Sequence, residues 1–126
     1  MHDGDEKINR IKLQTLRKQF EMTNMKEDES VSEFFLYVVL LTNQMKAYGE
    51  SISDLQKIEK VLRSLTANFN YIVVSIEESK NLAEMKVEEL QASLEAHEMR
   101  LKYRNSKREK VVEWDMQARF TKKYGK

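Results

Sequence analysis

Residues 30–49, with the sequence SVSEFFLYVVLLTNQMKAYG, predict a helix with a defined start and a defined end. Ser30 and Glu33 fit a capping box, in which the serine hydroxyl accepts the backbone N–H of Glu33 and the glutamate carboxylate accepts that of Ser30. Gly49 suits the left-handed conformation that commonly ends a helix. The apolar side chains between these signals recur every three or four residues, as one buried helix face requires. They are Val31, Phe34, Phe35, Val38, Leu41, Met45 and Tyr48.

The same segment is apolar on more than one side. Its stripe widens round the helix through four further residues, Leu36, Tyr37, Val39 and Leu40. A helix that is apolar on most sides is either buried centrally or covered by a partner on a second face. The sequence therefore predicts either a central position for this helix or a partner for its outer side.

Helical periodicity recurs before and after this segment. Residues 6–26 predict one helix, and Ser53 and Gln56 form a second capping pair that opens a helix reaching Leu65. The β-branched content of residues 70–76 favours a strand, but their apolar side chains keep helical spacing. Since a strand needs a partner strand and no other segment offers one, we predict a short helix there.

A last clear helix is predicted from Met85 to Tyr103, where the pattern decays. Residues 111–120 predict one more helix or a partly ordered extension. Short connections and the lack of an obvious linker predict an all-α compact bundle of about five helices. We assign residues 1–104 to this helical domain and residues 105–126 to a basic extension that is partly helical or flexible.

The composition agrees with a helical fold and excludes several classes of protein. The 126 residues include no Pro, no Cys and three Gly, too few turn-forming residues for a sandwich or barrel. Without Cys there is no disulfide framework and no thiolate metal site. The longest apolar run, residues 34–41, is far too short to span a bilayer, so we expect no membrane partner.

No residue pattern predicts catalysis. Adjacent carboxylates at 77–78 and 88–89 point about 100° apart on a helix and are poorly placed as an acid–base pair. The glycines lack the spacing of a phosphate-binding loop. His97 continues a leucine stripe without a second His four residues away, which favours a half-buried packing residue over a zinc ligand. We expect no catalytic residue, metal ligand, cofactor or small-molecule substrate.

The near-neutral charge conceals two opposite halves. Residues 100–126 carry ten basic and three acidic side chains, a net +7, whereas residues 1–99 carry 12 basic and 18 acidic, a net −6. A basic tail on an acidic body is typical of contact with nucleic acid, and the alternative is a solvated helix end with a flexible tail. The candidate residues for sequence-tolerant binding of single-stranded RNA are Arg100, Lys102, Arg104, Lys107, Arg108, Lys110, Lys122 and Lys123.

A series of short motifs spans residues 8–104. They are LQTLRKQF (13–20), MKEDESVS (25–32), NQMKAYGE (43–50), EKVLRSL (59–65), FNYIV (69–73), IEESK (76–80) and EELQASLEAHE (88–98). In this order and spacing, the series resembles the Gag polyprotein of copia-type LTR retrotransposons.

The resemblance implies an all-helical, retroviral-capsid-like domain that is structural rather than enzymatic. It implies self-association into a virus-like particle around the element's RNA in the cytoplasm. Contact with a neighbouring subunit would then cover the wide apolar surface of residues 31–48. The candidate self-association surface is Phe35, Val39 and Leu40.

One feature of that family does not carry over to this chain. Family members commonly continue into a Cys-Cys-His-Cys zinc knuckle that binds RNA, and this chain contains no Cys. Two other functions stay open: a sequence-tolerant RNA-binding module acting through the basic tail, and a domesticated Gag-derived domain that binds another protein.

Overall fold

The fold consists of helices throughout the described residues. The computed structural model describes the backbone of residues 2–124 and the side chains of residues 4–108, 110 and 116. The helices are α1 (His2–Met22), α2 (Val31–Ala47), α3 (Asp54–Ser64), the short 3₁₀ helix η1 (Ala67–Phe69), α4 (Asn70–Ser79) and α5 (Val87–Tyr124). No strand occurs between residues 2 and 124, so the all-α prediction is confirmed.

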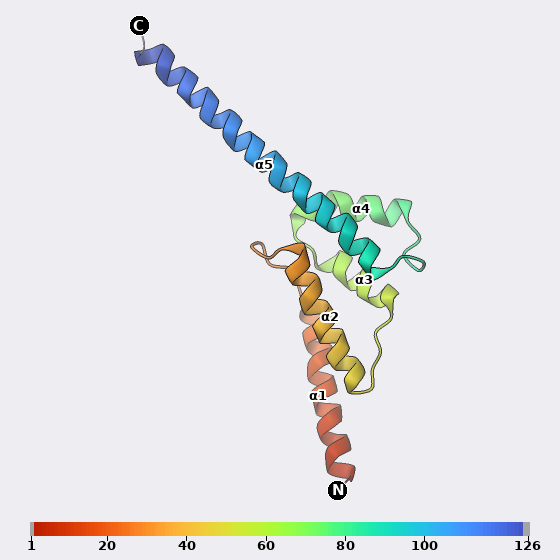
Figure 1. The fold of residues 1–126 in the computed structure, drawn as a ribbon. Helices are drawn as coiled ribbons and strands as arrows, with labels where there is room; N and C mark the ends of the chain where they lie inside the picture. Colours follow the sequence, from red (N-terminus) through yellow and green to blue (C-terminus); the bar gives the residue numbers. More distant parts are fainter. Residues whose placement is uncertain (1, 125–126) are drawn as a thin grey trace.

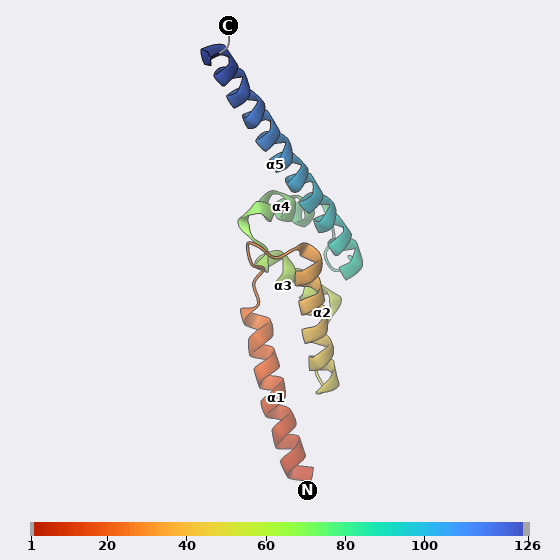
Figure 2. The same cartoon turned by 60° about the vertical axis from the view of Figure 1, so that its left-hand side comes forward.

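Helix α2 organises the packing. It lies beside α1 along one side and contacts the first part of α5 on another (Figures 1 and 2). The main core joins α2 to α3, η1, α4 and α5 and includes Val31, Phe34, Val38, Ile58, Phe69, Leu90 and Leu94. A smaller core forms where Leu16 of α1 meets Leu41 and Met45 of α2. Helix α2 therefore contributes to both cores through its inner face, as predicted for a central helix.

The local signals that begin and end the helices act as predicted. The Ser30 hydroxyl accepts the backbone N–H of Glu33 at 3.1 Å, and both halves of the capping box are present. Ser53 and Gln56 form the same reciprocal pair at the start of α3. Gly49 has φ of 103° and ends the α2 segment.

Two elements differ from their predicted bounds. The first helix spans His2–Met22 rather than 6–26, because the chain turns at residue 23 and the backbone N–H of Met25 bonds to the carbonyl of Ser64 at 2.8 Å. The segment predicted as a short helix at 70–76 is helical and extends to Ser79.

Helix α5 differs most from the prediction. Instead of ending near Tyr103, it continues without a break to Tyr124, so residues 111–120 are part of it rather than a separate helix. Its second half projects away from the other helices (Figures 1 and 2). A projecting helix has no core to face and needs no apolar stripe, which explains why the periodicity decays. The division of the chain at residue 104 stays a prediction.

Candidate interaction surfaces

The outer face of α2 is apolar and exposed. We define this outer α2 face by three residues, Leu36, Val39 and Leu40, with exposed fractions of 59%, 37% and 53%. No hydrogen bond or ion pair involves their side chains, which are hydrocarbon only. Apolar side chains gathered on one exposed face are typical of an association surface.

The assignment of Phe35 to the candidate self-association surface is wrong. Phe35 is 1% exposed and lies in the main core, with its ring edge-on to that of Phe34 at 6.4 Å between centroids. It points inward because it lies about 100° round the helix from Leu36. Phe35 is therefore a core residue, whereas Val39 and Leu40 lie on the surface as expected.

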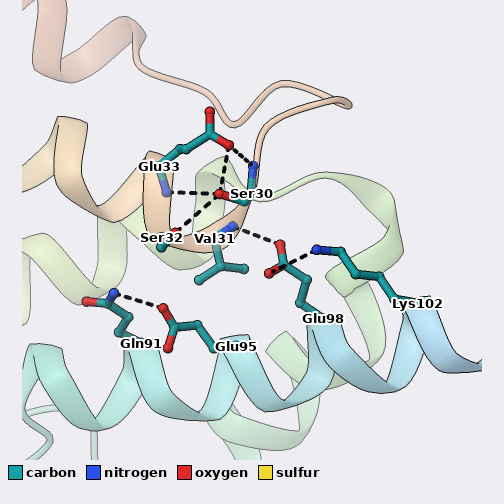
Figure 3. Close-up of polar contacts among 8 residues, drawn as sticks. All are labelled: Ser30, Val31, Ser32, Glu33, Gln91, Glu95, Glu98 and Lys102. Atoms are coloured by element: carbon teal, nitrogen blue, oxygen red, sulfur yellow. Dashed lines mark hydrogen bonds and ion pairs between the residues drawn. The ribbon is translucent and has the colours of Figure 1, made fainter.

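The start of α2 is held by α5. The Glu98 carboxylate accepts the backbone N–H of Val31 at 2.8 Å and lies 3.9 Å from the ammonium of Lys102 (Figure 3). Val31 is the first residue of α2, where backbone N–H groups have no partner inside the helix. The sequence alone does not reveal this role, because Glu98 follows Val31 by 67 residues and no local motif links them.

Most of the described basic side chains of α5 share one helix face, and Lys102 lies on another. All six from Arg100 to Lys110 are exposed. Four of them, Arg100, Arg104, Lys107 and Arg108, follow the spacing i, i+4, i+7 and i+8, which places them on one helix face. Lys102 instead turns toward Glu98, at 3.9 Å. The side chains of Lys122 and Lys123 lie outside the described residues.

His97 packs in the interior, as predicted. It is 9% exposed, with its ring 5.6 Å from that of Phe69 and its Nε2 3.4 Å from the carbonyl of Asn68. Among the side chains that the structure describes, no three of His, Cys, Asp or Glu gather in a way that would hold a metal ion. None of the described helices is long and apolar enough to cross a membrane.

These observations define an all-helical domain with an exposed apolar face on α2 and exposed basic side chains on α5. The chain belongs to the gag-polypeptides of LTR copia-type, because the sequence model of that family matches residues 1–107. Gag polypeptides are structural proteins, and the family is a non-enzymatic class. A comparison with curated proteins finds no match, and neither does one with solved structures. The predicted likeness to retroviral capsid domains therefore stays a prediction.

Proposed function

We propose that this chain is a structural Gag module that self-associates into a capsid-like particle and gathers single-stranded RNA in the cytoplasm. The observation that carries self-association is the outer α2 face. Leu36 and Leu40 lie one turn apart, and both are more than half exposed. Fully burying a Leu side chain contributes about 1.5–3 kcal/mol, and modest contacts of this kind, repeated in many copies, hold symmetric assemblies together.

Light scattering over a dilution series tests self-association. We expect the mean mass to rise with concentration, and Leu40→Ser to move the midpoint of association to roughly tenfold higher concentration. Met99→Ser is the matched control, since Met99 is also apolar and exposed but lies on α5. A strict monomer at high concentration, in both low and high salt, contradicts the proposal.

The observation that supports RNA binding is the basic face of α5. Arg100, Arg104, Lys107 and Arg108 share one side of a helix that projects from the body (Figure 1). Such a row tracks the phosphates of a flexible strand, and its affinity does not depend on base sequence. Exposed Tyr103 adds an aromatic ring for base stacking.

Electron microscopy of the purified chain with and without single-stranded RNA tests the two activities together. Particles that form or become regular only with RNA are the expected result. Lack of affinity for single-stranded RNA at low salt contradicts the RNA-binding part and leaves self-association standing.

A further inference from the structure

The surface where α1 and α2 meet contains a groove. Two adjoining hollows of about 480 and 540 Å³ share Thr15 and Gln19 in their lining. Ile11 and Met22 of α1 and Tyr37 of α2 contribute to the walls, and each is between 45% and 67% exposed. We call this surface the α1–α2 groove. It is concave and partly apolar, and it runs along the line where the two helices meet.

The α1–α2 groove is positively charged. Lys12, Lys18 and Lys26 contribute to its lining. Within the part of the chain that the structure describes, none of these lysines is in an ion pair. The one carboxylate in the lining belongs to Glu29, which accepts the backbone N–H of Lys26 at 3.0 Å and so turns back onto its own loop. The groove therefore suits an apolar segment with acidic flanks.

The outward face of α4 has that chemistry. Tyr71 is 83% exposed and Val74 is 53% exposed, one turn apart on this helix. Glu77 and Glu78 follow at the next turn, both exposed and in no ion pair among the described residues. An exposed tyrosine is a good candidate for a contact, since Tyr is enriched where proteins bind one another.

The other exposed apolar patches do not match the α1–α2 groove. Met99 and Tyr103 on α5 are flanked by Arg100, Lys102 and Arg104, whose charge repeats that of the groove. The outer α2 face has hydrocarbon side chains and no flanking carboxylate row. Charge complementarity across an interface favours opposite signs and disfavours like ones, so α4 is the matching partner in the described chain.

We propose that α4 of one copy docks into the α1–α2 groove of a second copy, a contact that rests on the self-association proposed above. The α4 helix lies at the end of the body from which α5 projects, whereas α1 and α2 run to the opposite end (Figures 1 and 2). The groove lies between α1 and α2, whereas the exposed residues Tyr71 and Val74 lie on α4. One copy can therefore donate its α4 to one neighbour and accept α4 from another, which is a head-to-tail contact. A head-to-tail contact leaves a free donor and a free acceptor after each addition, so it extends into rings or larger arrays.

The role of this contact differs from that of the outer α2 face. A face that pairs with itself across a two-fold axis closes after two copies. Adding a head-to-tail contact links such pairs to their neighbours. Together, the two contacts provide what a closed shell needs, which is more than one kind of repeated interface.

Reciprocal charge reversal tests this contact by sedimentation velocity. Glu77→Lys/Glu78→Lys places two lysines against the basic groove, and Lys18→Glu/Lys26→Glu places two glutamates against acidic α4. We expect each double variant to weaken association beyond the pair by roughly tenfold or more, because like charges then face each other. The variant with all four substitutions restores association. Mixing the two double variants also restores it, because the basic α4 of one then meets the acidic groove of the other and the acidic α4 meets the basic groove.

A matched control separates this contact from a general effect of charge. Glu59→Lys/Glu84→Lys makes the same change in net charge at two exposed carboxylates outside the described ion pairs, and it leaves association unchanged. If the wild-type chain associates but the α4 double variant associates equally well, the docking contact is wrong and self-association stands. If four reversals do not restore what two remove, the docking contact is also wrong. A wild-type chain that stays monomeric overturns both proposals.

Discussion

The Glu98 carboxylate on α5 accepts the backbone N–H of Val31 at 2.8 Å, so one helix caps the start of another. Ser30 and Glu33 satisfy the neighbouring groups at the same end of α2 (Figure 3). The helix that carries the outer α2 face is thereby fixed to the helix that carries the basic face. A direct hydrogen bond thus joins the first turn of α2 to the first part of α5.

Removing the Glu98 carboxylate should destabilise this junction. We expect Glu98→Ala to lower the free energy of unfolding by about 1–3 kcal/mol, because the N–H of Val31 loses its acceptor in a largely buried position. Glu98→Gln keeps an acceptor oxygen and should cost less. Urea unfolding followed by circular dichroism measures both.

Glu95→Ala is the control for that experiment. Glu95 lies one turn before Glu98 on α5, and its carboxylate accepts only the amide of Gln91 in the described structure (Figure 3). A contact between neighbours on one helix contributes a few tenths of a kcal/mol, about 0.2–0.5. Equal losses for Glu95→Ala and Glu98→Ala would contradict the capping role of Glu98.

The backbone conformation of Gly49 leads to a second prediction, on the stability of the fold. Its φ of 103° lies in a region that side chains disfavour, while a Cβ added there would meet no atom within 4 Å. We therefore expect Gly49→Ala to destabilise the fold by about 1–2 kcal/mol through backbone strain alone. Gly4→Ala in α1 is the matched change without positive φ, and thermal unfolding should show it to be neutral or slightly stabilising. The reverse order of the two effects would contradict this account.

Lys60 is a buried ammonium that ties α3 to α1. Its side chain is in the core region at 8% exposure, and its Nζ donates to the carbonyl of Glu21 at 2.5 Å. That carbonyl belongs to the last turn of α1, where it has no helical partner and where positive charge is favoured. Burial lowers the pKa of Lys60 below 10.5, Arg63 lowers it further, and Glu21 acts in the opposite direction.

The lowered pKa of Lys60 makes stability depend on pH. Between the folded pKa and 10.5, the unfolded chain binds more protons at this site than the folded chain. The free energy of unfolding therefore rises with pH in that window, relative to a variant that cannot titrate there. Urea unfolding of the wild type and Lys60→Met from pH 7 to 10 should show their difference moving in favour of the wild type. A difference that stays constant with pH would contradict this prediction.

The parts of the fold that sequence predicted depend on neighbouring residues. Ser30 with Glu33 and Ser53 with Gln56 lie three residues apart, so each cap is readable wherever the helix packs. The apolar spacing of residues 31–48 likewise reports one face of a helix. Residues 70–76 were correctly predicted as helical because spacing outweighs β-branched content when no strand is present to pair.

The parts that sequence did not predict depend on contacts between distant residues. Phe35 and Val39 are both apolar and one turn apart, yet Phe35 is 1% exposed and Val39 is 37% exposed, a difference that depends on how the other helices pack against α2. In the sequence, Glu98 is one of many carboxylates. Its capping role depends on α5 lying beside the start of α2. The length of α5 was missed for the opposite reason, since a helix without neighbours leaves no apolar pattern to read.

The basic face of α5 makes the final prediction, on RNA binding. Each phosphate neutralised by a basic side chain releases counterions, and the logarithm of the binding constant falls with the logarithm of salt concentration by about 0.7 per contact on a single strand. Arg104→Gln/Arg108→Gln removes two neighbouring charges from the proposed contact face. We expect it to weaken binding to single-stranded RNA at low salt and to reduce the salt slope by about 1.4.

The control for this effect is Lys7→Gln/Arg10→Gln on α1, which removes two exposed charges at the opposite end of the molecule. Fluorescence anisotropy with a short homopolymer RNA, titrated at several salt concentrations, measures both slopes. If binding depended only on net charge, the two double variants would weaken it equally, because each lowers the charge of the whole chain by the same amount. A slope that falls only for the α5 variant assigns the phosphate contacts to that helix, and equal slopes for both variants would contradict the assignment.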